Sequence, residues 1–296
     1  MTEMVKVYFD KNVLSHIISA QRGAAETNRV TLDDVKSLLS AVAEGKVMNL
    51  LSVMHLQEAS YALRALSPSV AQDELRLLKD LMNTREIIKF PSDLLKDDIT
   101  AYSEGHELSC PLIANPLNLD ELFSDKGDIA ERKKLLDDTD QSNANFLTST
   151  SNAKLNDLEC VLAEFGGKQP TFEEFYNKKI VERVVGLVSR TEEETGRKGL
   201  LDACKSKGLE QMLQVPSVAL AEGTSLSYQY ARIFEEMSEK KRKRLGDPGD
   251  LNHALLASAA NVLVTHDQDF VSWVDRIPYK PFKVLDHVTK LIQSLA

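Results

Sequence analysis

The sequence lacks a long apolar segment. No run of about 18 consecutive apolar residues occurs in the 296-residue chain, which argues against a membrane-spanning helix. At the N-terminus, MTEMVKVYFDKNV interrupts each short apolar stretch with a charge, so neither a signal peptide nor a membrane anchor is expected. We therefore expect no contact with a membrane.

Cysteine is scarce. The three cysteines are widely spaced, without a CxxC pair and without a histidine at zinc-ligand spacing: Cys110, Cys160 and Cys204. This pattern fits neither a disulfide framework nor a structural zinc site. We interpret the three side chains as reduced thiols, and the cytoplasm is the expected location.

An excess of positive charge is also missing. The net charge of -9 argues against a protein that coats nucleic acid without specificity, because such binding needs a basic surface. One local basic run, residues 240–244 (KKRKR), is either a solvated helix end or a strip that guides a phosphate backbone. The composition is that of a folded globular protein, with 43% hydrophobic and 27% charged residues, and it contains no repeat or low-complexity tract.

The two ends of the chain alternate strand and helix patterns. Strand patterns near the start cover residues 4–9 and 47–53, and those near the end cover 261–265 and 282–285. Helical patterns separate them: one begins at residue 13, one covers 31–43, where Thr31 and Asp34 have the spacing of a capping box, and one covers 54–66. This alternation predicts an α/β fold with a parallel sheet.

The middle of the chain has a different pattern. Helical periodicity dominates from about residue 69 to 230, for example at 70–82, 172–188 and 226–237. One further strand is expected at 85–90, and residues 105–167 have the weakest periodicity. We therefore expect one α/β domain in two parts, residues 1–104 and 226–296. Between them, residues 105–225 would form a large, mainly helical insertion.

Four acidic residues fall where functional groups gather in parallel sheets. Asp10 directly follows the first strand, and Asp267 lies just beyond the strand that ends at Thr265. Asp250 stands in the first turn of the helix before that strand, and Glu58 stands one turn into the helix after the second strand. The carboxyl ends of parallel strands meet at one edge, and carboxylates there suit hard cations such as Mg²⁺ and Mn²⁺.

Two segments resemble the opening and closing motifs of the PIN domain family: VYFDKNVLS near the start and DLNHALLASAANVLVTHDQDF near the end. The resemblance covers about residues 4–65 and 247–286, and the closing motif is the more specific. It implies a three-layer α/β/α fold with a mostly parallel central sheet. It also implies a catalytic set that binds Mg²⁺ or Mn²⁺: Asp10, Glu58, Asp250 and Asp267, with Asp269 as an additional ligand.

The resemblance implies a metal-dependent endoribonuclease that activates water and leaves 5′-phosphate and 3′-hydroxyl ends. RNA is favoured over DNA as substrate, because many similar proteins are toxin or processing ribonucleases, and a toxin would have a small inhibitory protein partner. Self-association is left open.

Residues expected to orient the carboxylates are Asn12 and Thr265. Residues expected to contact phosphate are Lys11, Lys241, Arg242 and Arg244. Lys11 replaces the small polar residue more frequent in the family, and the long middle segment also departs from a compact PIN domain.

Other interpretations of the same residues stay open. Asp10 could begin a turn, Asp250 could favour a helix dipole, and Asp267 and Asp269 could cap a short helix. Near the motifs, His253 and His266 could act as a general base, but a structural role is favoured for both. The same two roles stay open for His55. The alternative function is a non-catalytic PIN-like scaffold that binds RNA or protein. A phosphatase with an aspartyl intermediate would need a second acid where Asn12 stands.

Overall fold

The structure of the protein is a computed structural model. It describes residues 4–23, 30–55, 68–84, 86–108, 110–114, 157–235 and 248–295. Within these residues, no helix is both long enough and apolar enough to cross a membrane.

Four short strands form a parallel sheet in the order β2–β1–β5–β6. They are β1 (Val5–Phe9), β2 (Val47–Asn49), β5 (Val262–Val264) and β6 (Lys283–Leu285). Val7 is aligned with Asn49 on one side and with Val262 on the other. The first strand of the chain therefore lies inside the sheet, and the last part of the chain supplies two of its strands. The expected α/β class with a parallel sheet is confirmed.

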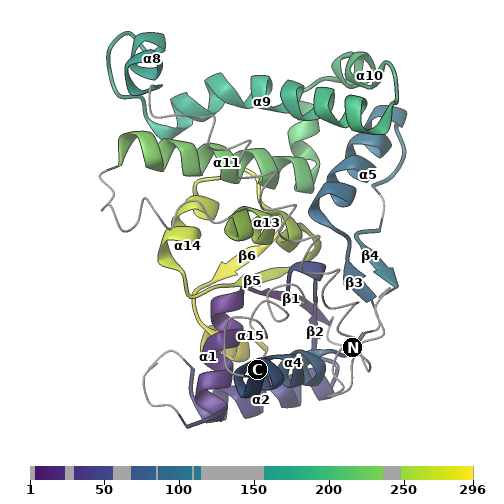
Figure 1. The fold of residues 1–296 in the computed structure, drawn as a ribbon, viewed down its shortest axis with the longest axis vertical. Helices are drawn as coiled ribbons and strands as arrows, with labels where there is room; N and C mark the ends of the chain where they lie inside the picture. The colour runs from purple at the N-terminus through teal and green to yellow at the C-terminus, as the bar shows by residue number, and fades with distance from the viewer. Residues whose placement is uncertain are drawn as a thin grey trace.

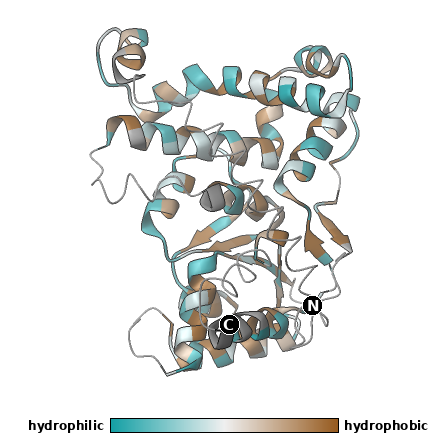
Figure 2. Cartoon of the chain, viewed as in Figure 1, coloured by the Kyte–Doolittle hydropathy of each residue, from teal (hydrophilic) through white to brown (hydrophobic). Residues whose placement is uncertain are grey.

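Helices pack on both faces of this sheet (Figure 1). On one face lie α1 (Lys11–Gln21), α2 (Leu32–Ala43), α4 (Pro68–Leu81) and α15 (Val288–Leu295). On the other face lie α13 (Pro248–Leu256) and α14 (Gln268–Asp275). Side chains of a strand alternate between faces. Val7 and Phe9 accordingly pack in the first core and Tyr8 in the second, and most residues of the strands are apolar (Figure 2).

A second group of helices lies beyond α13 and α14 (Figure 1). It contains α5 (Pro91–Glu104), α8 (Asp157–Glu164), α9 (Phe172–Thr195), α10 (Leu200–Lys207), the short 3-10 helix η1 (Gln211–Gln214) and α11 (Pro216–Phe234). Helix α11 packs against α9 on one side and α13 on the other, so it connects this group to the sheet. Helix α5 lies before residue 105, where the helical insertion is expected to begin. It nevertheless packs against α9, α10 and α11 of the helical group.

A small antiparallel sheet stands apart from the main one. It consists of β3 (Glu86–Ile88), in the segment where a strand is expected, and β4 (Leu112–Ala114), which the sequence analysis does not predict. An isolated parallel bridge between Ser52 and Ile88 connects β3 to the chain that follows β2.

Several element ends differ from the expected ones. Helix α1 begins at Lys11, two residues earlier than expected, because Asp10 caps it. Strand β2 ends at Asn49, short of residue 53. Helix α11 begins at Pro216, well before residue 226, with the proline in its first turn. Thr31 and Asp34 form the predicted capping box at the start of α2. In the helix expected at 54–66, only residues up to 55 are described.

Candidate functional site

Strands β1 and β5 end side by side at one edge of the sheet. The residues that directly follow them, Asp10 and Thr265, are held there by backbone hydrogen bonds. The Asp10 N–H donates to the Val264 carbonyl at 2.9 Å, and the Thr265 N–H donates to the Leu285 carbonyl at 3.0 Å. Because the strands are parallel, both side chains project at the carboxyl edge, where ligands bind in open α/β sheets.

The Asp10 carboxylate is almost fully buried, with 2% of the residue exposed. Its Oδ1 accepts a hydrogen bond from the Lys11 backbone N–H at 2.7 Å, and its Oδ2 accepts one from the Thr265 hydroxyl at 2.7 Å. Asp10 is thereby the N-cap of α1. The two bonds fix both oxygens of the carboxylate in one orientation.

Thr265 joins Asp10 to Asp267. The Thr265 residue is fully buried, and its Oγ1 both donates to Asp10 and accepts from the Asp267 backbone N–H at 3.1 Å. One hydroxyl group therefore holds together two segments whose bonded residues are 255 positions apart in the chain. Thr265 is expected to orient a carboxylate, and its hydroxyl donates to the Asp10 carboxylate.

Asp267 caps helix α14. Its Oδ1 accepts from the backbone N–H groups of Asp269 at 2.8 Å and Phe270 at 3.1 Å. Asp267 is half-buried, whereas Asp269 is exposed in the first turn of the helix. The capping role that the sequence left open for Asp267 is present. Capping and cation binding are compatible, because a carboxylate has more than two acceptor positions.

The other expected ligands lie partly or wholly outside the described residues. Helix α13 begins at Pro248, so the Asp250 backbone stands in its first turn, before β5; the Asp250 side chain is not described. Glu58 lies outside the described residues, as do Lys241, Arg242 and Arg244. Among the described side chains, no group of three or more His, Cys, Asp or Glu is placed to hold a metal ion. That finding therefore does not include the complete set of four acids.

Lys11 and Asn12 form the first turn of α1, directly after Asp10. The Asn12 Oδ1 atom is buried and makes no hydrogen bond to any described residue. A buried carbonyl oxygen without a partner costs about 1–3 kcal/mol, so its persistence requires an explanation. An oxygen in this position is suited to accept from water or to bind a cation.

Two histidines next to this edge face each other. The Nδ1 atoms of His16 and His266 are 2.5 Å apart, and the rings stack with centroids 4.8 Å apart. A third ring, that of His287, lies 5.3 Å from His266. A hydrogen bond between two ring nitrogens needs one that carries a proton and one that does not. His266 lies in the closing motif, whereas no motif marks His16 or His287.

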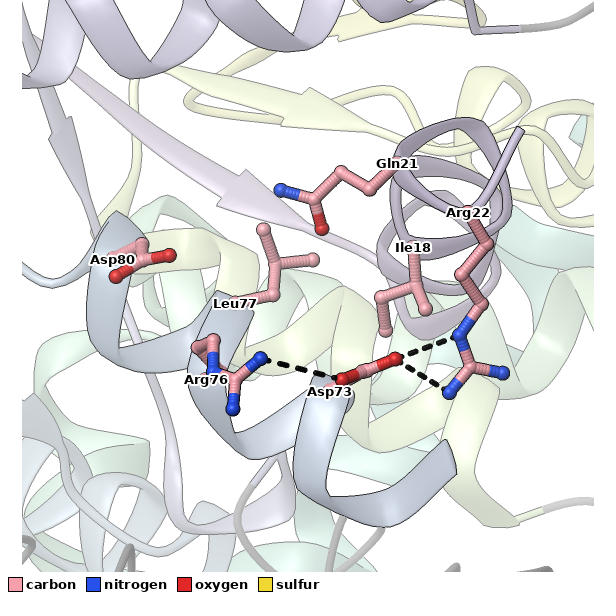
Figure 3. A pocket seen from close by; sticks show the side chains of 7 residues that line it. All are labelled: Ile18, Gln21, Arg22, Asp73, Arg76, Leu77 and Asp80. Atoms are coloured by element: carbon pink, nitrogen blue, oxygen red, sulfur yellow. Dashed lines mark hydrogen bonds and ion pairs between the residues drawn. The ribbon is translucent and has the colours of Figure 1, made fainter. Parts of the chain in front are cut away.

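A shallow pocket of about 230 Å³ lies elsewhere, between the end of α1 and helix α4 (Figure 3). It is lined by Ile18, Gln21, Arg22, Asp73, Arg76, Leu77 and Asp80. Asp73 forms ion pairs with both Arg22 and Arg76, at 2.6 and 3.7 Å. Ile18, which lines the pocket, lies eight residues after Asp10 along α1, a rise of about 12 Å, so the pocket is separate from the start of the helix.

Comparison of the chain with protein-family models, with curated proteins and with solved structures found no match.

Proposed function

We propose that the protein is a PIN-like, metal-dependent nuclease, with RNA as the favoured substrate. One observation carries the proposal. The buried Asp10 carboxylate, at the end of an interior parallel strand, is held by a threonine hydroxyl that also holds the Asp267 backbone. The residues in contact are those that the resemblance assigns to the acidic edge, although they come from opposite ends of the chain.

The donor atoms at this edge fit a hard divalent cation. Asp10 and Asp267 offer carboxylate oxygens, and the buried Asn12 Oδ1 offers an amide oxygen without a hydrogen bond to any described residue. Mg²⁺ and Mn²⁺ bind such oxygens together with water. In this proposal Asp10, Asp267, Asp250 and Glu58 hold the cation.

A divalent cation bound there would supply a Lewis acid that activates water and stabilises the departing 3′-oxygen. The chain's own residues would position the reaction. Thr265 keeps the Asp10 carboxylate in one orientation, and the charge of Lys11, in the first turn of α1, would attract a phosphate. The overall charge of -9 makes such local cations necessary for binding a polyanion.

A second candidate, a non-catalytic scaffold, also has a specific observation in its favour. Asp10 and Asp267 both cap helices, which is a sufficient structural reason for an acid at each position. The two functions predict different results for Asp→Asn substitutions. Asparagine caps a helix about as well as aspartate does but lacks the negative charge, so the cap survives and the cation site is lost.

The test is cleavage of single-stranded and structured RNA and DNA oligonucleotides with Mn²⁺, with Mg²⁺ or with EDTA. We expect cleavage by the wild type with either metal, none with EDTA, and a loss of at least about 100-fold in Asp10→Asn and Asp267→Asn, as for removal of an essential group. Thr171→Ala is the matched control, because it removes the N-cap of α9, in the helical group, at a cost of about 1 kcal/mol.

If Thr171→Ala cleaved at the wild-type rate, a loss of stability alone would not explain the loss of cleavage in the asparagine variants. If both asparagine variants cleaved as fast as the wild type, the acidic site would be wrong. If no metal supported cleavage and the asparagine variants bound RNA as the wild type does, the scaffold would be the better description. An inhibitory protein partner, as in toxin systems, would be sought by copurification only after cleavage had been established.

A further inference from the structure

A buried polar cluster lies directly behind the acidic edge. It consists of Tyr8, Ser52, His55 and His253, and none of the four residues is more than 3% exposed. The Tyr8 hydroxyl lies 2.7 Å from His253 Nδ1 and 3.1 Å from Ser52 Oγ. The His55 ring packs against the Tyr8 ring with centroids 4.8 Å apart. The cluster is thus continuous from α13, across β1, to the chain after β2.

The hydrogen bonds of His55 determine its protonation. Its Nδ1 atom accepts from the Ser52 backbone N–H at 3.1 Å, so Nδ1 carries no proton. Its Nε2 atom lies 2.7 Å from the Phe9 carbonyl oxygen, which can only accept, so Nε2 must donate. His55 is therefore a neutral ring with one defined tautomer. It binds the carbonyl group that directly precedes Asp10.

The other end of the cluster reaches α13. His253 stands three residues after Asp250 in this helix, and its bond to the Tyr8 hydroxyl fixes the helix against β1. His55 stands three positions before Glu58 in the sequence. The four side chains therefore join the segments that carry, or lead into, three of the four acids.

Such a cluster is costly in a core that apolar residues could fill, because each buried polar group must keep its hydrogen bonds. Apolar contacts tolerate small sliding of one segment on another, whereas hydrogen bonds define distance and direction. Metal sites need this accuracy, and substitution of the groups that orient ligands typically weakens metal binding 10- to 100-fold.

We propose that Tyr8, Ser52, His55 and His253 form a positioning network that holds the acid-bearing segments at the spacing required for a divalent cation. The inference rests on the proposed function, because it assumes that the acids bind a cation. None of the four residues is assigned to the cation or to the substrate.

The test compares two tyrosine variants. Tyr8→Phe removes only the hydroxyl that joins His253 to Ser52. Tyr230→Phe removes a buried hydroxyl that donates to the Pro170 carbonyl at 2.9 Å, in the helical group away from the edge. Both variants lose a buried tyrosine hydrogen bond, so a general loss of stability affects both, and only the first disturbs the cluster.

The measured quantity is the dissociation constant for Mn²⁺, obtained from the electron paramagnetic resonance signal of free Mn²⁺. Each protein is measured below its unfolding temperature. We expect Tyr8→Phe to weaken Mn²⁺ binding about tenfold and Tyr230→Phe to leave it unchanged. His55→Ala should weaken binding as well. His55→Gln should restore much of it, because the glutamine amide can donate to the Phe9 carbonyl in place of Nε2.

Equal Mn²⁺ affinity in Tyr8→Phe and Tyr230→Phe would overturn the network and leave the metal site intact. Failure of the wild type to bind Mn²⁺, or equal binding by Asp10→Asn, would instead overturn the proposed function and the network with it. If Tyr8→Phe did not fold, the two His55 variants would decide: no recovery in His55→Gln relative to His55→Ala would count against positioning.

Discussion

Ser217 and Asp98 form a buried hydrogen bond between distant residues of the helical group. Asp98 is only 4% exposed in α5, and its Oδ2 accepts from the hydroxyl of the fully buried Ser217 in α11 at 2.5 Å. Burial raises the pKa of the Asp98 carboxyl above its usual value, although the Ser217 hydrogen bond acts in the opposite direction. A carboxyl in this environment makes the stability of the protein depend on pH.

The direction of that dependence follows from the raised pKa. The folded state binds the Asp98 proton more tightly than the unfolded chain, whose aspartate titrates near a pKa of about 4. The stabilisation that the proton provides is complete below that pH and is lost as pH rises through the folded-state pKa.

We therefore predict that Asp98→Asn, which does not titrate, gains free energy of unfolding relative to the wild type as pH rises from 4 to 8. The gain should not exceed about 1.4 kcal/mol per pH unit. Urea unfolding at several pH values measures it, with Asp93→Asn, at an exposed position of the same helix, as the control. A difference between Asp98→Asn and wild type that is independent of pH would contradict the prediction.

At the level of single residues, the sequence was informative where a motif fixed the spacing. The closing motif leads to the expectation that Thr265 orients a carboxylate, and its hydroxyl is hydrogen-bonded to Asp10. The Tyr8 hydroxyl was not predicted to be functional, because Tyr8 lies within a strand of core residues. Its bonding partners are 44 and 245 positions away in the chain, and nothing local indicates them.

Two glycines within helices illustrate how packing decides the effect of the same substitution. Gly186 in α9 has nothing within 4 Å of the position that a Cβ atom would occupy. At Gly223 in α11, a Cβ atom would lie 2.8 Å from the Ile277 Cγ2 atom and 3.3 Å from its Cγ1 atom. Glycine thus allows α11 to approach the end of α14 closely.

We predict that Gly186→Ala raises the free energy of unfolding by about 0.5–1 kcal/mol, because alanine loses less backbone entropy in a helix. Gly223→Ala should lower it by about 1 kcal/mol, because overpacking of a filled core outweighs that gain. Thermal or urea unfolding of the pair measures both effects. Equal stabilisation by the two substitutions would mean that Ile277 moves aside at little cost.

Element boundaries were predictable where local chemistry marked them. The capping box of Thr31 and Asp34 located the start of α2. Helix α5 was not predicted, although Pro91 in its first turn and Gly105 at its end are typical boundary residues. Its buried face includes Asp98 between Leu94 and Ala101, so a charged residue interrupts the apolar pattern that would have revealed the helix.

At the scale of the whole molecule, the interior position of β1 predicts where stability is highest. Strand β1 pairs with β2 and β5, and its last three residues are at most 1% exposed. We predict that its backbone amides exchange with solvent only on global unfolding, and more slowly than those of the outer strand β6. Hydrogen exchange followed by mass spectrometry or NMR measures this. Faster exchange in β1 than in β6 would show that the sheet opens from its interior.

The α/β class was predictable because alternating strand and helix patterns occupy both ends of the chain. The arrangement of the helical group was not, because its contacts join α5 to helices that begin 81 or more residues later (172 − 91 = 81). The separate antiparallel sheet was also missed. Strand β4 has only three residues, which is too short for alternation to be recognised.

The pairing of β1 with β5 has a consequence for biosynthesis. Thr265 leaves the ribosome 255 residues after Asp10, which at about 5–20 residues per second means a delay of roughly 10–50 s. During this time β1 can pair with β2, but its other edge has no partner from the native sheet. Any product of premature termination before residue 262 therefore lacks both β5 and the hydroxyl group that holds Asp10, and such truncated chains would need a chaperone or a protease.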